Sequence, residues 1–186
     1  MSSKMINLLA SQIRIRRIAV TVKWAAITAM AGIVSVAGYS LVHRSVTWKA
    51  TALSTVTVHA SISQGATDYP QFAVWLDLLP EAALLYGLFR LVQMMQAYER
   101  GEIFSSRVST HLQAFSLAII AVELLNITQP LQVAALRALA GYAIPEFSMS
   151  ATGEQLWSLL LAALFLVLAQ ILKESARVAE DSASII

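Results

Sequence analysis

The sequence predicts an all-α membrane protein with four transmembrane helices. The chain of 186 residues is 58% hydrophobic and only 13% charged, whereas a soluble domain usually carries about 25% charged residues. Its apolar residues gather in four stretches near the ~20 residues that cross a bilayer as a helix. Its basic residues accumulate in alternate connections between these stretches, as they do in multi-pass membrane proteins.

The four predicted spans are unequal in quality. They cover approximately residues 18–42, 72–95, 112–128 and 156–172. The first follows Arg14, Arg16 and Arg17, and it is longer than the roughly 7–15 apolar residues of a signal peptide, which favours a retained helix over a cleaved leader. The last contains no charged residue and is the clearest span. The whole chain, 1–186, is therefore expected to form a single transmembrane domain.

Two connections between the spans have patterns of their own. The mainly extracytoplasmic loop between the first two spans alternates Thr and Val over Thr55–Val58, which indicates a short strand or β hairpin. The connection after the third span begins with an apolar stretch, Leu131–Tyr142. This stretch indicates a short helix on the membrane surface, which Gly141 and Pro145 would stop.

The distribution of basic residues predicts the orientation in the membrane. Segments 1–17, 96–111 and 173–186 hold most of them, while the other two connections hold only Arg44, Lys49 and Arg137. Because Lys and Arg accumulate on the cytoplasmic side, these three segments and both termini are predicted to be cytoplasmic. Lys23 and Arg90, inside the spans near this boundary, are expected to be topology anchors whose side chains reach the headgroups.

Three acidic residues fall within the second and third spans. Asp77 and Glu81 are four residues apart and share one face of a helix, and Glu123 falls at a similar depth. Carboxylates in lipid are costly and normally face the bundle interior or water, so one interpretation is a polar pocket, open to the outside, for a cation, a proton or a basic group of a ligand. In the alternative, the second helix starts near Leu79, Asp77 lies in water, and the two glutamates make interhelical hydrogen bonds.

No pattern typical of an active site or a metal centre is present. The chain has no cysteine, and its histidines, His43, His59 and His111, lack the spacing of zinc ligands. There is no glycine-rich phosphate loop, and the basic residues form no nucleic-acid stripe. We therefore expect a non-enzymatic protein with no cofactor, no metal and no direct nucleic-acid partner. Small residues on the first helix predict close helix packing, which leaves a homo-oligomer open.

Two predicted cytoplasmic segments carry short motifs. Gly101 can end the second helix as a left-handed cap, and Ser105 or Ser106 can cap the third. The C-terminal tail continues the fourth helix as an amphipathic extension. Both segments are interpreted either as residues that end and start helices at the membrane boundary or as a docking surface for a cytoplasmic partner. The residues of this candidate surface are Gly101, Glu102, Phe104, Ser105, Glu180 and Asp181.

Together with the four-span layout, these motifs resemble the bacterial domain-of-unknown-function 2975 family. Its members have a Gly-acid-x-Phe-Ser/Thr pattern, matched here from Gly101 to Ser105, and an acidic pair before apolar residues, matched by Glu180, Asp181 and the terminal isoleucines. A glycine common in the family is replaced here, at Ser175 or Ala176. The resemblance implies a small inner-membrane protein without an assigned activity. Some similar proteins are encoded beside a small helix-turn-helix regulator, which implies a partner of that kind.

Two classes of function follow from these features. The first is a membrane protein that senses or binds a ligand and interacts with a protein partner. The second is a small transporter, channel subunit or immunity-type protein that uses the acidic residues of the second and third helices. A membrane enzyme has no positive evidence in the sequence.

Overall fold

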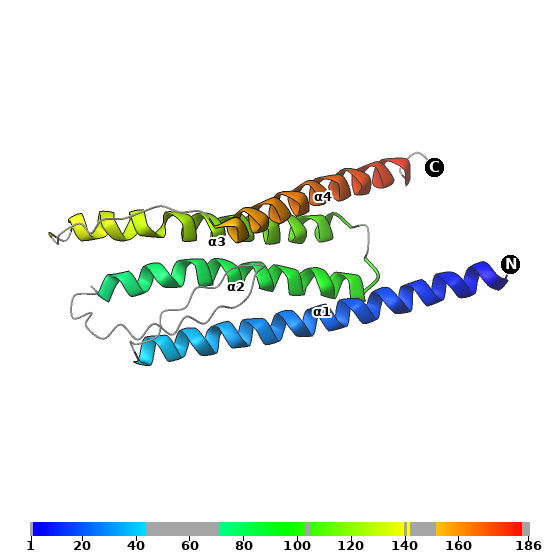
Figure 1. The fold of residues 1–186 in the computed structure, drawn as a ribbon. Coiled ribbons are helices and arrows are strands. Elements are labelled where there is room, and N and C mark those ends of the chain that lie inside the picture. Colours follow the sequence, from blue (N-terminus) through cyan, green and yellow to red (C-terminus); the bar gives the residue numbers. More distant parts are fainter. Residues whose placement is uncertain (1, 44–70, 103–104, 140, 142–151, 184–186) are drawn as a thin grey trace.

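The fold consists of four helices that run up and down. The computed structural model describes residues 2–43, 71–102, 105–139, 141 and 152–183. Its helices are α1 (Ser2–His43), α2 (Gln71–Glu99), α3 (Ser106–Leu139) and α4 (Gly153–Ala183). Figure 1 shows both chain termini at one end of the bundle, together with the connection between α2 and α3. We call this the terminal end and the opposite one the distal end.

Each helix contains a stretch that is long and apolar enough to cross a membrane. These stretches have mean hydropathies of 1.2 to 2.1 and cover Arg14–Tyr39, Leu78–Glu99, Ser106–Leu136 and Gly153–Val178. Large apolar side chains such as Trp24, Leu160 and Ile171 are exposed, and a bilayer provides the apolar surroundings that such surfaces need. The prediction of an all-α protein with four transmembrane helices is confirmed. The predicted hairpin lies outside the described residues.

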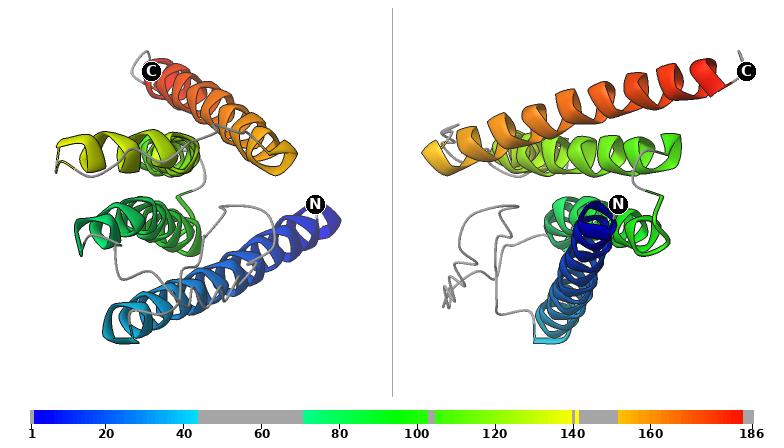
Figure 2. Two further views of the ribbon diagram at one scale, coloured as in Figure 1. Left: turned by 60° about the vertical axis from the view of Figure 1, so that its left-hand side comes forward. Right: turned by 90° about the vertical axis from the view of Figure 1, so that its right-hand side faces the viewer.

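The helices pack in chain order. α1 packs on α2, α2 on α3, and α3 on α4 (Figure 2). Toward the terminal end, one buried cluster takes residues from all four helices, and its members are Ala19, Met94, Met95, Ala97, Val108, Leu112 and Ala169. Small residues recur in it because lipid is as apolar as the side chains, so that close packing rather than exclusion of water holds membrane helices together.

A close approach between helices joins α2 to α3 at Gly87. A Cβ atom added to Gly87 would lie 2.9 Å from the Cβ atom of Ala118. Only a glycine at this point leaves room for the Ala118 side chain without a shift of either helix. Gly87 and Ala118 therefore fix the register in which α2 and α3 pack.

The connection between α2 and α3 is built as the sequence predicts. Gly101 has φ = +83°, its N–H donates to the carbonyl of Tyr98, and the N–H of Glu102 donates to the carbonyl of Ala97. This pair of bonds is a Schellman cap, which satisfies carbonyls left over at a helix C-terminus. Ser105 then caps α3, because its carbonyl and hydroxyl both accept from the N–H of Val108, at 3.0 and 3.4 Å. Both predicted caps are confirmed.

Two helices extend further than the sequence suggested. The stretch from Leu131 was expected to form a separate surface helix, but α3 runs through Pro130 to Leu139. A proline removes one backbone hydrogen bond, yet a break in lipid would expose more unsatisfied groups, so membrane helices tolerate it. Gly141, with φ = +75°, follows the end of α3 as predicted. α2 begins at Gln71, close to the predicted start of the second span at residue 72 and well before the alternative start near Leu79, so that Asp77 lies within the helix.

The start of α4 is fixed by a capping box. The hydroxyl of Thr152 accepts from the N–H of Gln155 at 3.3 Å, and the Gln155 side chain accepts from the N–H of Thr152 at 2.9 Å. This reciprocal pair satisfies two backbone donors that a helix N-terminus would otherwise leave free.

Candidate functional site

Two of the three predicted pocket residues are buried within the membrane-spanning part of the bundle. The side chain of Glu81 is 6% exposed and that of Glu123 is 0% exposed. Glu81 directly follows Pro80, which lies inside α2 and is also buried. Asp77 belongs to the same helix, but its side chain lies outside the described residues. The structure therefore describes a candidate site with one carboxyl group on α2 and one on α3.

The register of α2 and α3 places these two carboxyl groups at nearly the same depth. Glu81 lies six residues before Gly87, and Glu123 lies five residues after Ala118. Because the helices are antiparallel, both steps lead from the close contact toward the distal end. At about 1.5 Å per residue, the steps measure roughly 9 and 7.5 Å. The difference in depth is thus smaller than one helical turn.

The two acids also lie on the same side of the α2–α3 pair. At roughly 100° per residue, Glu81 is about 120° around α2 from Gly87, and Glu123 is about 140° around α3 from Ala118. The two helices run in opposite directions. A rotation in the same sense about each helix axis, followed along each chain, therefore moves a side chain toward the same side of the α2–α3 pair. Both side chains therefore lean toward one flank of the central pair, and each lies more than about 90° around its helix from the α2–α3 contact.

Helix α1 contacts α2, and helix α4 contacts α3. Glu99 lies 18 residues, or five turns, after Glu81 and so shares its face of α2. Lys23 of α1 binds Glu99, which places α1 against that face. On the other helix, the ring of Phe115 lies 6.2 Å from the ring of Phe165, which joins α3 to α4. The acids are thus enclosed by helices rather than turned toward lipid.

Two polar residues that the sequence analysis did not single out lie close to Glu123 along the helices. Asn126 is one turn further along α3, and its Nδ2 atom is buried with no hydrogen-bond partner in the described part of the chain. Ser158 of α4 is 1% exposed, and it lies at the depth of Glu123 if depths are counted from the Phe115–Phe165 contact. Asn126 could have been found from the sequence, because it lies three residues after Glu123. Ser158 could be placed near that depth only once the register of α4 against α3 was known.

The arrangement combines two buried carboxyl groups with neutral donors and acceptors. A carboxylate deep in a bilayer is costly unless it binds a proton, a cation or a donor. Within the described ranges, no group of three or more His, Cys, Asp or Glu side chains is placed to hold a metal ion.

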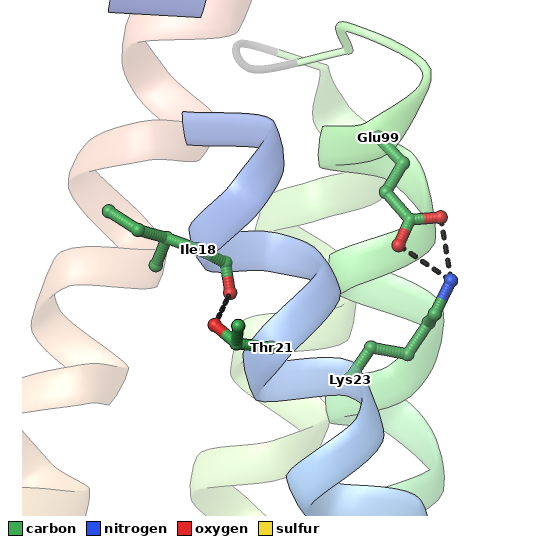
Figure 3. A network of polar contacts seen from close by, with 4 residues as sticks. All are labelled: Ile18, Thr21, Lys23 and Glu99. Carbon is green, nitrogen blue, oxygen red and sulfur yellow. Dashed lines mark hydrogen bonds and ion pairs between the residues drawn. The ribbon is translucent and has the colours of Figure 1, made fainter. Parts of the chain in front are cut away.

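Near the terminal end, a charged residue of α1 pairs with a charged residue of α2. Lys23 was expected to be a topology anchor that reaches the headgroups, and the structure adds a partner: its Nζ atom lies 2.6 Å from Oε1 and 2.8 Å from Oε2 of Glu99. The two side chains are 19% and 21% exposed. Figure 3 shows the lysine extending from α1 toward the end of α2, with Thr21 bonded within α1 to the carbonyl of Ile18. Lys23 is therefore an interhelical ion-pair partner.

Arg90 is held within its own helix. Its Nε donates to the hydroxyl of Tyr86 at 3.0 Å, and one terminal nitrogen donates to Oε1 of Gln93 at 3.3 Å. The guanidinium also lies 5.0 Å from the centre of the Tyr86 ring, within the range of a cation–π contact. These contacts partly satisfy the cation along the α2 surface.

The candidate docking segments lie at the terminal end but are only partly described. Gly101 is exposed, while Glu102 and Ser105 are half-buried. Phe104 and the side chains of Glu180 and Asp181 lie outside the described residues. The structure thus places both segments at one end of the bundle and describes no contact between them.

Comparison with known proteins assigns the chain to a family. No curated protein and no solved structure matches the chain. A model of a family described as a protein of unknown function (DUF2975) matches residues 56–186. The match takes in α2, α3 and α4, and with them both buried acids and the two terminal-end motifs. This multi-pass membrane protein with four transmembrane helices belongs to the DUF2975 family.

Proposed function

We propose that this protein is a non-enzymatic sensor of the bacterial inner membrane with both termini in the cytoplasm. It binds a cation, a proton or a basic group of a ligand at Glu81 and Glu123. It interacts through its cytoplasmic segments with a protein partner, such as a small helix-turn-helix regulator. One observation carries the proposal: two carboxyl groups, one on α2 and one on α3, are buried within the membrane-spanning part of the bundle.

Binding at this site can alter the cytoplasmic end of the bundle through α2. The helix runs without interruption from Glu81 to Glu99 and ends in the Gly101 cap. A ligand that draws the two carboxyl groups together or apart changes the preferred packing of α2 against α3. Because a helix is stiff along its axis, such a change reaches the connection that carries Gly101 and Ser105. A ligand can shift this equilibrium only by its difference in affinity for the two arrangements.

The binding step is tested with the full chain in detergent and ethylammonium chloride as the probe. We expect the probe to raise the midpoint of thermal unfolding of the parent protein and of an E154Q variant, which alters an exposed acid at the distal end. The double variant E81Q/E123Q should lose this response. Equal probe-induced shifts in all three proteins would contradict binding at the buried pair.

The orientation is tested by thiol labelling, because the natural chain contains no cysteine. In intact spheroplasts, a membrane-impermeant maleimide should label S150C and spare S182C. Permeabilisation should expose both thiols. Labelling of S182C in intact cells would reverse the proposed orientation.

The partner interaction is tested by affinity capture from mild detergent with a co-expressed small helix-turn-helix regulator as the candidate partner. We expect the regulator to be recovered with the parent chain and lost with F104A or with E180K/D181K. Recovery at the parent level with both variants would reject these segments as the docking surface.

The same buried acids also favour a second function, namely a small transporter or channel subunit. In proteoliposomes, cation or proton flux should then depend on Glu81 and Glu123 and disappear in E81Q/E123Q. Absence of flux in the parent protein, combined with binding of the probe, would favour the sensor.

A further inference from the structure

A second site, separate from the buried acids, lies at the terminal end between α3 and α4. The structure contains an open cavity of about 410 Å³ there, and its lining residues are Ser106, Gln170, Lys173, Glu174 and Arg177. Ser106 is the first residue of α3, and the other four belong to the last turns of α4. We propose that this cavity binds the phosphate group of an anionic phospholipid.

The charge of the cavity suits an anion. Lys173 and Arg177 are four residues apart on α4 and therefore lie on one face of the helix. Among the described residues, neither cation forms an ion pair. Among the described residues of the lining, Glu174 is the one acid, so two positive charges face one negative charge. Arginine and lysine together offer several donors for phosphate oxygens.

The start of α3 adds backbone donors to these side chains. Ser105 caps the N–H of Val108, while the N–H groups of the first helical residues have no acceptor within a helix. The positive end of the helix dipole attracts anions to the same place. This N-terminus is relevant because it borders a cavity that is also lined by the cationic side chains of Lys173 and Arg177.

The surface next to the cavity suits the acyl chains of a lipid. Val167 precedes Gln170 by three residues on α4, and Leu160 precedes Val167 by seven, so that both continue the Gln170 side of the helix toward the distal end. Their side chains are 52% and 59% exposed. Ser106 and Val178 end the apolar stretches of α3 and α4, which places the cavity at headgroup level. A phosphate in the cavity would thus leave its acyl chains against an apolar helix face.

The test measures thermal unfolding of the full chain in detergent, with phosphatidylglycerol, phosphatidylcholine or inorganic phosphate added. We expect phosphatidylglycerol to raise the unfolding midpoint by several degrees and phosphatidylcholine to have a much smaller effect. K173A/R177A should lose at least half of the shift, while R14A/R16A, which removes exposed cations of α1, should retain it. Millimolar inorganic phosphate should give little stabilisation, because it lacks the contact of acyl chains with Val167 and Leu160.

Two further variants keep the test decisive if K173A/R177A is poorly folded. S106D adds a negative charge at the cavity while preserving a residue that favours a helix start, and it should weaken the lipid response. E174Q removes the opposing charge and should strengthen it. A lipid response that is equal in the parent, S106D and E174Q would overturn the site. Saturation by inorganic phosphate with the same shift would overturn the assignment to a lipid.

Discussion

The central pair α2–α3 and the outer helices α1 and α4 differ in how much of their surface is buried by other helices. In an apolar window of 18 residues within each helix, 39% and 44% of the residues of α2 and α3 are buried, against 11% and 17% of those of α1 and α4. The central pair contains the Gly87–Ala118 contact and both buried acids. The outer helices contribute few buried residues and carry polar contacts near their ends, such as the Thr152 cap and Lys23.

The stability of the central pair therefore depends on how its side chains fit together. The outer helices depend mainly on having apolar side chains that suit lipid. Association of membrane helices depends on close packing and on polar contacts rather than on removal of apolar surface from water. Substitutions in the central pair should therefore have large effects, and similar substitutions in the outer helices small ones.

The largest effect is expected from reversing a buried charge in α3. E123K places a cation where the structure encloses a fully buried carboxyl group, and an uncompensated buried charge costs about 3–5 kcal/mol. Unfolding of the purified protein in detergent, followed by circular dichroism, measures the loss. E123Q, which keeps the shape and stays neutral, should cost much less.

The matched control for E123K is E174K, at an exposed position of α4. Surface changes usually stay within about 0.5 kcal/mol. If E123K and E174K destabilised the protein equally, the burial of Glu123 in the central pair would be wrong.

A smaller but clear effect is expected from filling the space at Gly87. G87A brings a Cβ atom to 2.9 Å from that of Ala118, and overpacking of this kind typically costs about 1–3 kcal/mol. G87L should cost more than G87A, because the larger side chain pushes α2 from α3. Thermal unfolding midpoints in detergent provide the measurement, and G32L in α1, where an added Cβ meets nothing within 4 Å, provides the control.

Sequence reasoning anticipated features that depend on local patterns. The four spans follow from apolar runs, and the caps at Gly101 and Ser105 follow from residues that suit one backbone conformation. The continuation of α3 through Pro130 was not anticipated, because the usual effect of proline in water is weakened in lipid.

The contacts of the candidate site depend on register rather than on local pattern. Glu81 and Glu123 could be named from the sequence, since acids within apolar spans are unusual. The pairing of Lys23 with Glu99 joins residues that are 76 positions apart, and no periodicity links them. Likewise, Ser158 could be assigned to the depth of Glu123 only once α4 was placed against α3.

The ion pair between Lys23 and Glu99 tests the link between an outer helix and the central pair. Both side chains are about one-fifth exposed, so the pair falls between surface pairs, worth at most about 1 kcal/mol, and buried pairs, whose disruption costs about 3–5 kcal/mol. We expect K23A and E99A each to destabilise the protein by about 1–2 kcal/mol. A double-mutant cycle isolates the coupling energy.

The charge-swapped variant K23E/E99K sharpens this measurement. It should recover part of the lost stability, because it restores an ion pair with the same two helices in contact. Additive single effects, with no recovery in the swapped protein, would show that the two helices are held together by packing around Ala19 and Met95 alone.

The smallest effect is expected at the exposed start of α4. T152A removes the hydroxyl that accepts from the N–H of Gln155, and loss of such a cap typically costs about 0.5–2 kcal/mol. The lower part of this range applies, because Thr152 is exposed and water can replace the lost acceptor. Hydrogen exchange at the first turn of α4 is the most sensitive measurement, since the change should raise local opening there without altering protection in α2 and α3. T152S, which keeps the hydroxyl, should behave like the parent protein. If T152A instead loosened the central pair, α4 would contribute to the geometry of that pair, and the contrast between central and outer helices would have to be redrawn.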